Sequence, residues 1–348
     1  MKHLIVITQK VDSNEDLLGF FVSWLREMAH QVERVSVITL KAGNYDLPSN
    51  VTVYSLGREY GTSKLTQFFR FYYYLFKVIP ASNGIFAHMA PVFVIATWPV
   101  AMLFRKRIIF WYLHRAVTLR LRIAEKLCYR IVTALKESLS IASKKIIETG
   151  HGIDIEAFSS QRSWNTPERW EIISVGRISP IKNLETLIRA ATQLREIMPL
   201  HIRIIGQIGR KEEESYLMSL KNLVRTLNIE DLIEFTGVMP YNKLPDIYRQ
   251  AHITVNLTPR GGLDKVVLES MAAGCLTLTS NPAFKSDFGQ YADQLLFSHG
   301  DVADLVSKIQ HLVALDNNAK EAISEAFRQN AKRHNIPQVI KRILNLFP

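Results

Sequence analysis

The stretch Trp170-Glu-Ile-Ile-Ser-Val-Gly-Arg-Ile-Ser-Pro-Ile-Lys-Asn183 joins a short apolar run, a glycine, two cations and the start of a helical pattern. The apolar run predicts a buried strand, and Gly176 permits a tight turn directly after it. Arg177 has a planar fork of N–H donors and Lys182 a mobile ammonium group, and both suit phosphate oxygens. A helix beginning at Asn183 would direct the positive end of its dipole to the same place. The stretch therefore predicts a strand–loop–helix unit with an anion site, although a solvated loop with surface cations fits the same residues.

A second stretch, Thr258-Pro-Arg-Gly-Gly-Leu-Asp-Lys-Val-Val-Leu-Glu-Ser-Met-Ala-Ala-Gly274, follows another apolar run. Its consecutive glycines would let backbone N–H groups approach an anion. The helix after them is apolar apart from Glu269, and a buried carboxylate without a partner is costly. Glu269 could accept hydrogen bonds from sugar hydroxyls. The alternative is that it reaches solvent or pairs with Lys265, four positions before it.

Short apolar runs alternate with helical patterns along the whole chain. In the first half the predicted strands are 3–8, 34–39, 51–55, 84–87, 107–112, 131–134 and 145–148, with helices at 15–30, 63–79, 92–104, 116–129 and 137–142. In the second half the predicted strands are 170–175, 202–206, 232–236, 253–256, 276–279 and 295–297, with helices at 183–198, 211–227, 243–249, 264–273, 302–314 and 317–333. Such alternation is typical of α/β folds with parallel, doubly wound, Rossmann-like sheets.

The length of 348 residues allows two domains, and the segment from Gly150 to Pro167 is rich in Gly, Ser, Asn and Pro. We predict an N-terminal domain over residues 1–160 and a C-terminal domain over 161–335, facing each other across a ligand cleft. The amphipathic segment 336–348 needs a surface to cover, and we expect it to complete the N-terminal domain.

The net charge of +11 is unevenly distributed. Residues 1–150 carry +10 (20 Lys and Arg against 10 Asp and Glu), and the remainder carries +1 (23 against 22). The basic first half suits an acidic partner, which could be anionic lipid, a phosphate-bearing acceptor or nucleic acid. Because no nucleic-acid-binding module or zinc motif is visible, we do not expect nucleic acid.

Two segments bear on a membrane surface. Residues 68–76 are densely aromatic, and residues 115–130 form a basic amphipathic pattern. Both could lie on anionic lipid, or both could be helices packed on a sheet with a solvated outer face. We expect no membrane span and no signal peptide, and the separated Cys128 and Cys275 suit a reducing compartment. The predicted location is therefore cytoplasmic, with peripheral attachment to the inner face of the membrane as a further option.

Two more motifs lie between the opening stretches, namely Ile204-Ile-Gly-Gln-Ile-Gly209 and Glu234-Phe-Thr-Gly-Val238. Each of the four motifs is weak alone, but the ordered series across residues 170–280 is specific. It resembles the donor-binding half of the retaining glycosyltransferases of family 4 (glycosyl transferases group 1), which have the GT-B fold.

The resemblance implies that Arg177 and Lys182 bind the diphosphate of a nucleotide-sugar donor, that Glu269 binds its ribose, and that Val238 lies beside its base. Backbone N–H groups of residues 262–264 would face the distal phosphate. The full predicted donor site is Gly176, Asn183, Gly206, Val238, Gly261, Gly262, Leu263, Asp264, Lys265 and Glu269.

In the first half, His114 follows a predicted strand, and the family often has a histidine at such a place near the sugar and the acceptor. We therefore group His114 with Arg177 and Lys182 as catalytic, although a structural or surface histidine fits the same position. The remaining acceptor-side candidates also follow strands, and each could instead be a loop or capping residue: Asp12, His88 and His151.

This chain departs from the family pattern at one point. The family commonly has two glutamates eight positions apart, the first of which touches the donor sugar, but the position eight before Glu269 is Gly261. Asp264 in the same loop could substitute for the missing carboxylate.

The resemblance implies a retaining, metal-independent hexosyltransferase that uses a UDP- or GDP-linked sugar and no further cofactor. Its acceptor would be a glycan or lipid-linked saccharide, as in cell-surface polysaccharide synthesis. Two alternatives stay open, a sugar-nucleotide epimerase of similar fold and a non-catalytic protein that binds a nucleotide sugar or nucleic acid.

Overall fold

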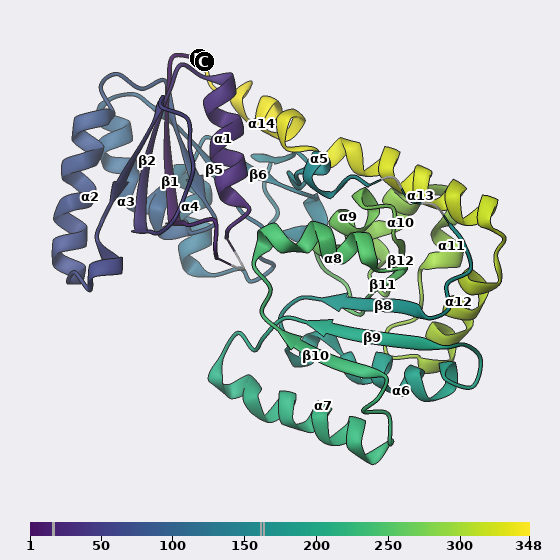
Figure 1. Ribbon diagram of the computed structural model, residues 1–348. Coiled ribbons are helices and arrows are strands. Elements are labelled where there is room, and N and C mark those ends of the chain that lie inside the picture. The colour runs from purple at the N-terminus through teal and green to yellow at the C-terminus, as the bar shows by residue number, and fades with distance from the viewer. Residues whose placement is uncertain (16–17, 161, 163) are drawn as a thin grey trace. The chain divides into compact units, whose positions relative to one another are not determined.

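The computed structural model describes residues 1–15, 18–160, 162 and 164–348 (Figure 1). The chain forms two compact units. Unit 1 comprises residues 1–153 and 334–348, and unit 2 comprises residues 154–333. The first boundary between the two units therefore lies between Ile153 and Asp154, whereas the sequence predicted the domain boundary after residue 160.

Unit 1 contains a seven-stranded parallel sheet in the order β3-β2-β1-β4-β5-β6-β7. Its strands are β1 His3–Val11, β2 Arg34–Ala42, β3 Val51–Ser55, β4 Gly84–His88, β5 Arg107–Trp111, β6 Arg130–Thr133 and β7 Ile146–Glu148. All seven predicted strands of the first half are present. The central strands are buried on both faces, as their near-continuous Val and Ile runs predict.

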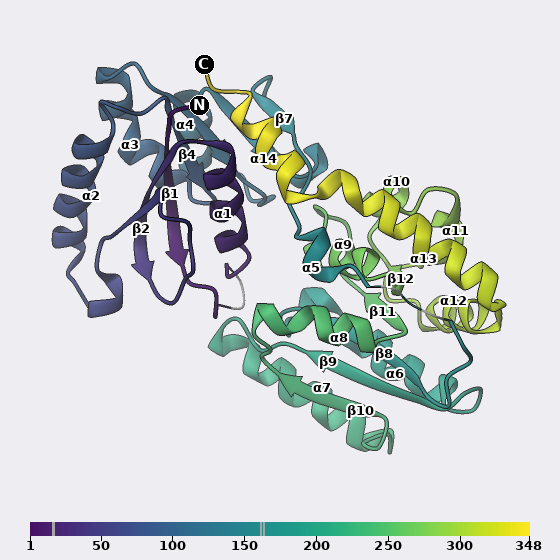
Figure 2. The ribbon, with the colours of Figure 1, turned by 45° about the horizontal axis from the view of Figure 1, so that its top comes forward.

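Helices cover both faces of this sheet (Figure 2). One face carries α1 Phe21–Gln31 and α14 Ile336–Leu344, and the other carries α2 Lys64–Val78, α3 Pro91–Leu103 and α4 Leu119–Leu127. The helix predicted at 137–142 is wrong, because only a single 3-10 turn forms there, η2 Lys136–Ser138. The two serines of this short segment, Ser138 and Ser140, favour local hydrogen bonds over helix propagation. Part of the helix predicted at 15–30 lies outside the described residues.

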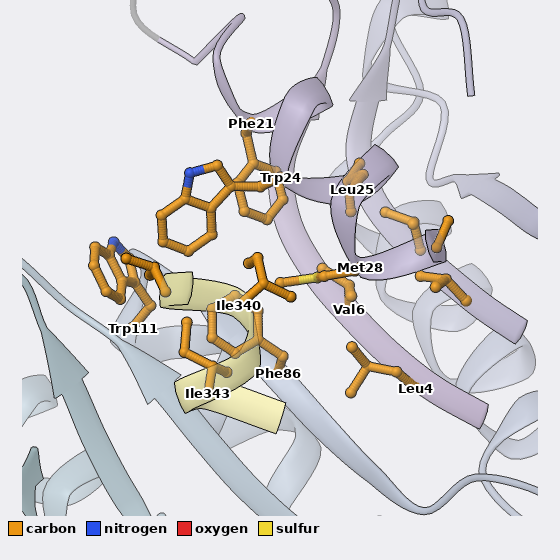
Figure 3. Close-up of a cluster of buried hydrophobic side chains, with 14 of the residues drawn as sticks. Leu4, Val6, Phe21, Trp24, Leu25, Met28, Phe86, Trp111, Ile340 and Ile343 are labelled. Carbon is orange, nitrogen blue, oxygen red and sulfur yellow. The ribbon is translucent and has the colours of Figure 1, made fainter. Parts of the chain in front are cut away.

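The core between the sheet and the α1–α14 face joins residues from the two ends of the chain. Trp24 and Met28 of α1 pack with Ile340 and Ile343 of α14 and with Phe86 of β4 (Figure 3). The indole N–H of Trp24 donates to the carbonyl of Gly152 at 2.8 Å. The apolar stripe of the C-terminal segment therefore completes a core that the N-terminal residues cannot close alone.

Unit 2 contains a five-stranded parallel sheet in the order β10-β9-β8-β11-β12. Its strands are β8 Trp170–Val175, β9 Leu200–Ile205, β10 Ile233–Gly237, β11 Ile253–Asn256 and β12 Leu276–Thr279. Its longer helices are α6 Leu184–Leu194, α7 Glu214–Thr226, α8 Leu244–Gln250, α9 Lys265–Ala272, α12 Val302–Ala314 and α13 Asn317–Ala331. The strand predicted at 295–297 is wrong, because only a single bridge between Thr279 and Leu296 forms there.

Short helical segments complete the two units. The four-residue α-helices are α5 Ile155–Phe158, α10 Lys285–Phe288 and α11 Ala292–Leu295. The remaining 3-10 turns are η1 Arg58–Tyr60, η3 Pro180–Lys182, η4 Lys211–Glu213, η5 Tyr241–Lys243, η6 Pro282–Phe284, η7 Gly289–Tyr291 and η8 Lys332–His334.

Each sheet reverses its strand order once, between β1 and β4 in unit 1 and between β8 and β11 in unit 2. Ligands of doubly wound sheets bind outside the carboxyl ends of the strands at such switch points. None of the described helices is both long enough and apolar enough to cross a lipid bilayer.

We predict that Ile340→Ala lowers the free energy of unfolding of unit 1 by about 3 kcal/mol, because Ile340 is fully buried and its removal leaves a cavity. Lys341→Ala, on the exposed side of the same helix, is the control and should change it by less than about 0.5 kcal/mol. Urea unfolding followed by tryptophan fluorescence measures both, and equal effects would contradict the packing of α14.

Candidate functional site

Glycines end three adjacent strands of unit 2. Gly176, Gly206 and Gly237 follow or close β8, β9 and β10, with φ of 144°, 141° and 74°. Two of these glycines are joined by a hydrogen bond, because the N–H of Gly206 donates to the carbonyl of Gly237 at 2.9 Å. A Cβ at Gly206 would lie 1.9 Å from the carbonyl oxygen of Gly176. Only glycine fits there, and the strand ends form a surface of bare backbone.

Lys182 lies beside this surface, in η3. Its ammonium group forms an ion pair with Asp264 Oδ2 at 2.9 Å and donates to Thr258 Oγ1 at 2.8 Å. These partners belong to the loop after β11, whereas Lys182 belongs to the loop after β8. The ion pair therefore joins the two loops across the switch point of the sheet, next to a small recess lined in part by Gly176, Arg177 and Asn256.

Asp264 is the centre of a polar network. Its Oδ2 also accepts hydrogen bonds from Thr258 Oγ1 at 2.6 Å and from Asn256 Nδ2 at 2.9 Å. Asn256 in turn accepts from Thr279 Oγ1 at 3.0 Å. Burial would raise the pKa of Asp264, but the Lys182 charge and the hydrogen bonds outweigh it and hold the pKa below its ordinary value. Asp264 is therefore a fixed negative charge that orients the Lys182 ammonium.

Arg177 is exposed, and its guanidinium lies against Gly209 in the loop after β9. A Cβ placed on Gly209 would lie 3.0 Å from Arg177 Nη1. Within the part of the chain that the structure describes, Arg177 forms no ion pair or hydrogen bond. Asn183 adopts the left-handed conformation (φ 43°) and links η3 to α6. The first N–H of α6, that of Leu184, donates to Tyr216 Oη at 3.1 Å, so this helix terminus is partly occupied.

Glu269 is buried in α9, with 1% of its surface exposed. Its Oε1 lies 2.8 Å from the Lys265 ammonium, and that ammonium lies 3.8 Å from the centre of the Tyr241 ring. Burial, and then the Glu269 charge, raise the pKa of Tyr241. The pairing with Lys265, one of the alternatives that the sequence left open, is therefore present. A carboxylate oxygen has two lone pairs, so Oε1 keeps acceptor capacity beside its ion pair with Lys265.

The glycine loop before α9 has room on one side. A Cβ at Gly261 would have no heavy atom within 4 Å, and its φ is not in the left-handed region. The carbonyl of Gly262 accepts from Asn281 Nδ2 at 3.0 Å, and Leu263 is buried, so the rest of the loop is anchored. Val238 follows β10 and is 41% exposed.

The predicted residues of unit 1 differ in accessibility. His114 is exposed, with its ring 5.6 Å from that of Tyr112. Asp12 Oδ2 lies 3.6 Å from the Lys10 ammonium, and the Asp12 side chain packs against the backbone of Gly43. His151 is buried, and its backbone N–H donates to His334 Nδ1 at 3.2 Å.

His88 is fully buried, stacked on Phe21 at 3.8 Å between ring centres and hydrogen-bonded through Nδ1 to Thr8 Oγ1 at 3.1 Å. In this structure it presents no polar atom to a ligand. Its predicted contact with an acceptor stays a prediction, as do those of Asp12, His114 and His151.

Among residues 1–15, 18–160, 162 and 164–348, no three His, Cys, Asp or Glu side chains come together as a potential metal site.

The family model described as glycosyl transferases group 1 matches residues 156–334, which is more than half of the chain. The chain belongs to this glycosyltransferase family. Two curated relatives are mannosylfructose-phosphate synthase of Agrobacterium fabrum, 30% identical over 31% of this chain and 25% of the relative, and D-inositol 3-phosphate glycosyltransferase of Thermobifida fusca, 32% identical over 35% and 31%. The putative colanic acid biosynthesis glycosyltransferase WcaL of Escherichia coli is 24% identical over 60% and 52%. The matched part thus spans from a quarter to just over half of these relatives.

Solved structures resemble the whole chain. HepE of Anabaena in complex with UDP and glucose has a TM-score of 0.75 at 14% identity, with 99% of each chain covered. Sucrose-phosphate synthase of Thermosynechococcus elongatus has a TM-score of 0.79 at 16% identity, covering 99% of this chain and 98% of that one. The predicted fold class, GT-B with two doubly wound Rossmann-like domains, is confirmed.

The sequence pattern of this family member did not indicate most of the partners that hold the predicted residues. Asn256 could have been found, because a polar side chain ending a buried strand at a switch point is unusual. Thr258 follows in the same loop, but nothing in the sequence pattern links Tyr216 to the start of α6.

We predict a pH dependence of stability that comes from His88. Burial lowers its pKa from 6.5 to about 3, so the folded protein keeps the imidazole neutral where the unfolded chain binds a proton. The free energy of unfolding should be undiminished above pH 6.5 and should fall by up to about 1.4 kcal/mol for each pH unit between 6.5 and 3.

Urea unfolding at a series of pH values measures this slope. His88→Gln removes the titrating group and should flatten it, whereas His311→Gln, on the exposed side of α12, should leave it unchanged. An identical slope in the His88→Gln protein would show that another group is responsible.

Proposed function

We propose that this member of the family is a retaining, metal-independent hexosyltransferase. It would move a sugar from a UDP- or GDP-linked donor to a hydroxyl of a glycan or lipid-linked saccharide. The observation that carries the proposal is the Lys182 ammonium, held at the switch point of unit 2 by Asp264 and Thr258. Two of its three N–H donors are engaged there, which leaves one for a phosphate oxygen.

The comparisons support the class of donor. The HepE structure contains UDP and glucose, and a human relative, 25% identical over 47% of this chain, is a GDP-Man:Man(3)GlcNAc(2)-PP-Dol alpha-1,2-mannosyltransferase. These proteins use different bases, so the base of the donor for this chain is left as UDP or GDP.

In the proposed reaction the bond between the anomeric carbon and the diphosphate oxygen breaks, and its electron pair goes to that oxygen. Lys182, Arg177 and the N-terminus of α6 would stabilise the charge that develops on the diphosphate. The sugar passes through an oxocarbenium-like transition state. The acceptor hydroxyl attacks the face that the leaving group vacates and gives its proton to the departing phosphate oxygen, so the configuration is retained.

The rest of the donor would occupy the predicted residues around this point. Glu269 would accept a ribose hydroxyl, because its two carboxylate oxygens offer more lone pairs than the ion pair with Lys265 uses. The base would lie beside Val238, and the backbone N–H groups of residues 262–264 would face the distal phosphate. His114 and the other candidates of unit 1 would serve the acceptor.

For the location, we propose a cytoplasmic protein that acts at the inner face of the membrane. The net charge of +10 on residues 1–150 supports this proposal, because anionic lipid attracts a basic surface.

Removal of either cation tests the mechanism. Lys182→Ala and Arg177→Ala should each lower the rate of transfer about 100-fold to 1,000-fold, because each removes a charge that stabilises the leaving group. Lys285→Ala, an exposed lysine of α10, is the control and should transfer at the wild-type rate. Transfer is measured with radiolabelled UDP- and GDP-sugars, and melting temperatures verify folding.

Because Lys182→Ala leaves the Asp264 carboxylate without its counter-charge, the Lys182→Ala/Asp264→Ala double variant separates folding from catalysis. It should fold as the wild type does and remain slow. Rapid transfer by this double variant would disprove the proposal. Conversion of the donor to an epimer without any acceptor would indicate the epimerase alternative.

A second experiment restores the absent carboxylate. Asp264 is engaged with Lys182, and the position of Gly261 is open. We therefore predict that Gly261→Glu raises kcat/KM for a hexose donor by about tenfold, the effect of one hydrogen bond from a sugar hydroxyl to a charged group. Gly261→Gln, of similar size without the charge, should gain less. A loss of activity in both variants would mean that the space at residue 261 belongs to the substrate.

A further inference from the structure

Residues 60–124 contain nine Lys and Arg and no Asp or Glu. The segment includes α2, α3 and most of α4, the three helices that cover one face of the unit 1 sheet. Its cations are Lys64, Arg70, Lys77, Arg105, Lys106, Arg107, Arg115, Arg120 and Arg122. The three helices contain a single carboxylate, Glu125 near the end of α4, and it accepts a hydrogen bond from Ser143 at 2.7 Å. A surface helix normally mixes both signs of charge, so this excess of cations requires a reason.

Helix α2 is apolar on two sides. Its inner side packs Phe71, Leu75 and Val78 into the core beneath the sheet. Its outer side carries large apolar residues that are between 47% and 65% exposed, and we call this set the aromatic face: Leu65, Phe68, Phe69, Tyr73 and Phe76. Figure 2 shows α2 and α1 on opposite sides of the unit 1 sheet. None of the residues of the aromatic face belongs to the two hydrophobic clusters that pack on this sheet.

The neighbouring helices continue this apolar surface. The ring of Phe76 lies 6.3 Å from that of Phe104, directly after the exposed Met102 and Leu103 at the end of α3. The hydroxyl of Tyr72 donates to the carbonyl of Ala96 in α3 at 3.0 Å, which fixes α2 against α3. Unit 1 thus exposes a continuous apolar band across two helices.

Helix α4 adds exposed apolar and basic side chains to the same layer. Leu119 and Ile123 are one turn apart and 73% and 38% exposed, and the exposed Arg120 and Arg122 flank them. Within the described residues, neither arginine forms an ion pair, so their charges face solvent uncompensated.

We propose that the outer surface of α2, α3 and α4 binds an anionic lipid bilayer. The aromatic face would enter the boundary between headgroups and acyl chains, and the cations would contact lipid phosphates. Charge selects this occupant: a second copy of the chain docking by the same face would set exposed cations such as Arg120 and Arg122 against like charges, whereas an anionic membrane complements them. The surface lies within unit 1 alone and does not depend on the proposed reaction.

Flotation of the full-length protein with lipid vesicles tests the proposal. We expect binding to phosphatidylcholine vesicles that contain phosphatidylglycerol, weaker binding to phosphatidylcholine alone, and release at high salt. Phe69→Ser/Tyr73→Ser should weaken binding to anionic vesicles about tenfold or more. Met218→Ser, an equally exposed apolar residue on α7 of unit 2, is the matched control and should bind as the wild type does.

The cations are tested in the same assay. Arg120→Gln/Arg122→Gln should weaken binding to anionic vesicles about fivefold for each cation removed. The control Lys211→Gln/Lys285→Gln removes the same charge from exposed positions of unit 2 and should leave binding unchanged. Because all substituted side chains are exposed, melting temperatures should not change.

Three results would overturn the proposal. The first is no binding to anionic vesicles at low salt, and the second is equal weakening by the unit 1 variants and their unit 2 controls. The third is a dimer in analytical ultracentrifugation that Phe69→Ser/Tyr73→Ser abolishes, which would assign the aromatic face to a second copy. Transfer to a soluble acceptor should be unaffected in every variant, so the outcome is separable from that of the proposed function.

Discussion

The ion pair between Lys182 and Asp264 determines the arrangement of the candidate site. It joins the loop after β8 to the loop after β11, at the switch point of the unit 2 sheet. Because Thr258 and Asn256 also bond Asp264, the ammonium is held in one position before any ligand arrives. A cation held in place costs no reorganisation when charge develops next to it. The same carboxylate also repels an incoming anion, so the site combines attraction and repulsion at one point.

The alternation of apolar runs and helical patterns was sufficient to predict both sheets, because strands buried on both faces have continuous Val and Ile runs. The same pattern gave wrong predictions where the secondary structure that a segment prefers locally differs from the one that tertiary packing allows. The segment 137–142 has apolar residues at helical spacing, but its serines and short length end the helix after one turn. The run 295–297 is apolar because Leu295 and Phe297 are buried, yet it forms a single bridge pair and no strand.

Within the site, the sequence predicted residues whose role depends on position after a strand, and it missed those whose role depends on a distant partner. Arg177 and Lys182 follow Gly176 at a strand end, and this local pattern was enough. The partner of Glu269 lies one helical turn away, so the sequence included Lys265 among the alternatives. Tyr216 meets the start of α6 from another helix, and no local pattern encodes such a meeting.

The chain leaves unit 1 at Ile153 and returns at His334, and these two points touch. The N–H of Ile153 donates to the carbonyl of His334 at 2.8 Å, and the N–H of Ile336 donates to the carbonyl of Ile153 at 3.0 Å. Unit 2 is therefore an insertion with adjacent entry and exit. During synthesis on the ribosome, the inserted unit has all its strands before α14 emerges. Unit 1 is begun first but must be completed last, because its core lacks α14 until all of unit 2, residues 154–333, has been synthesised.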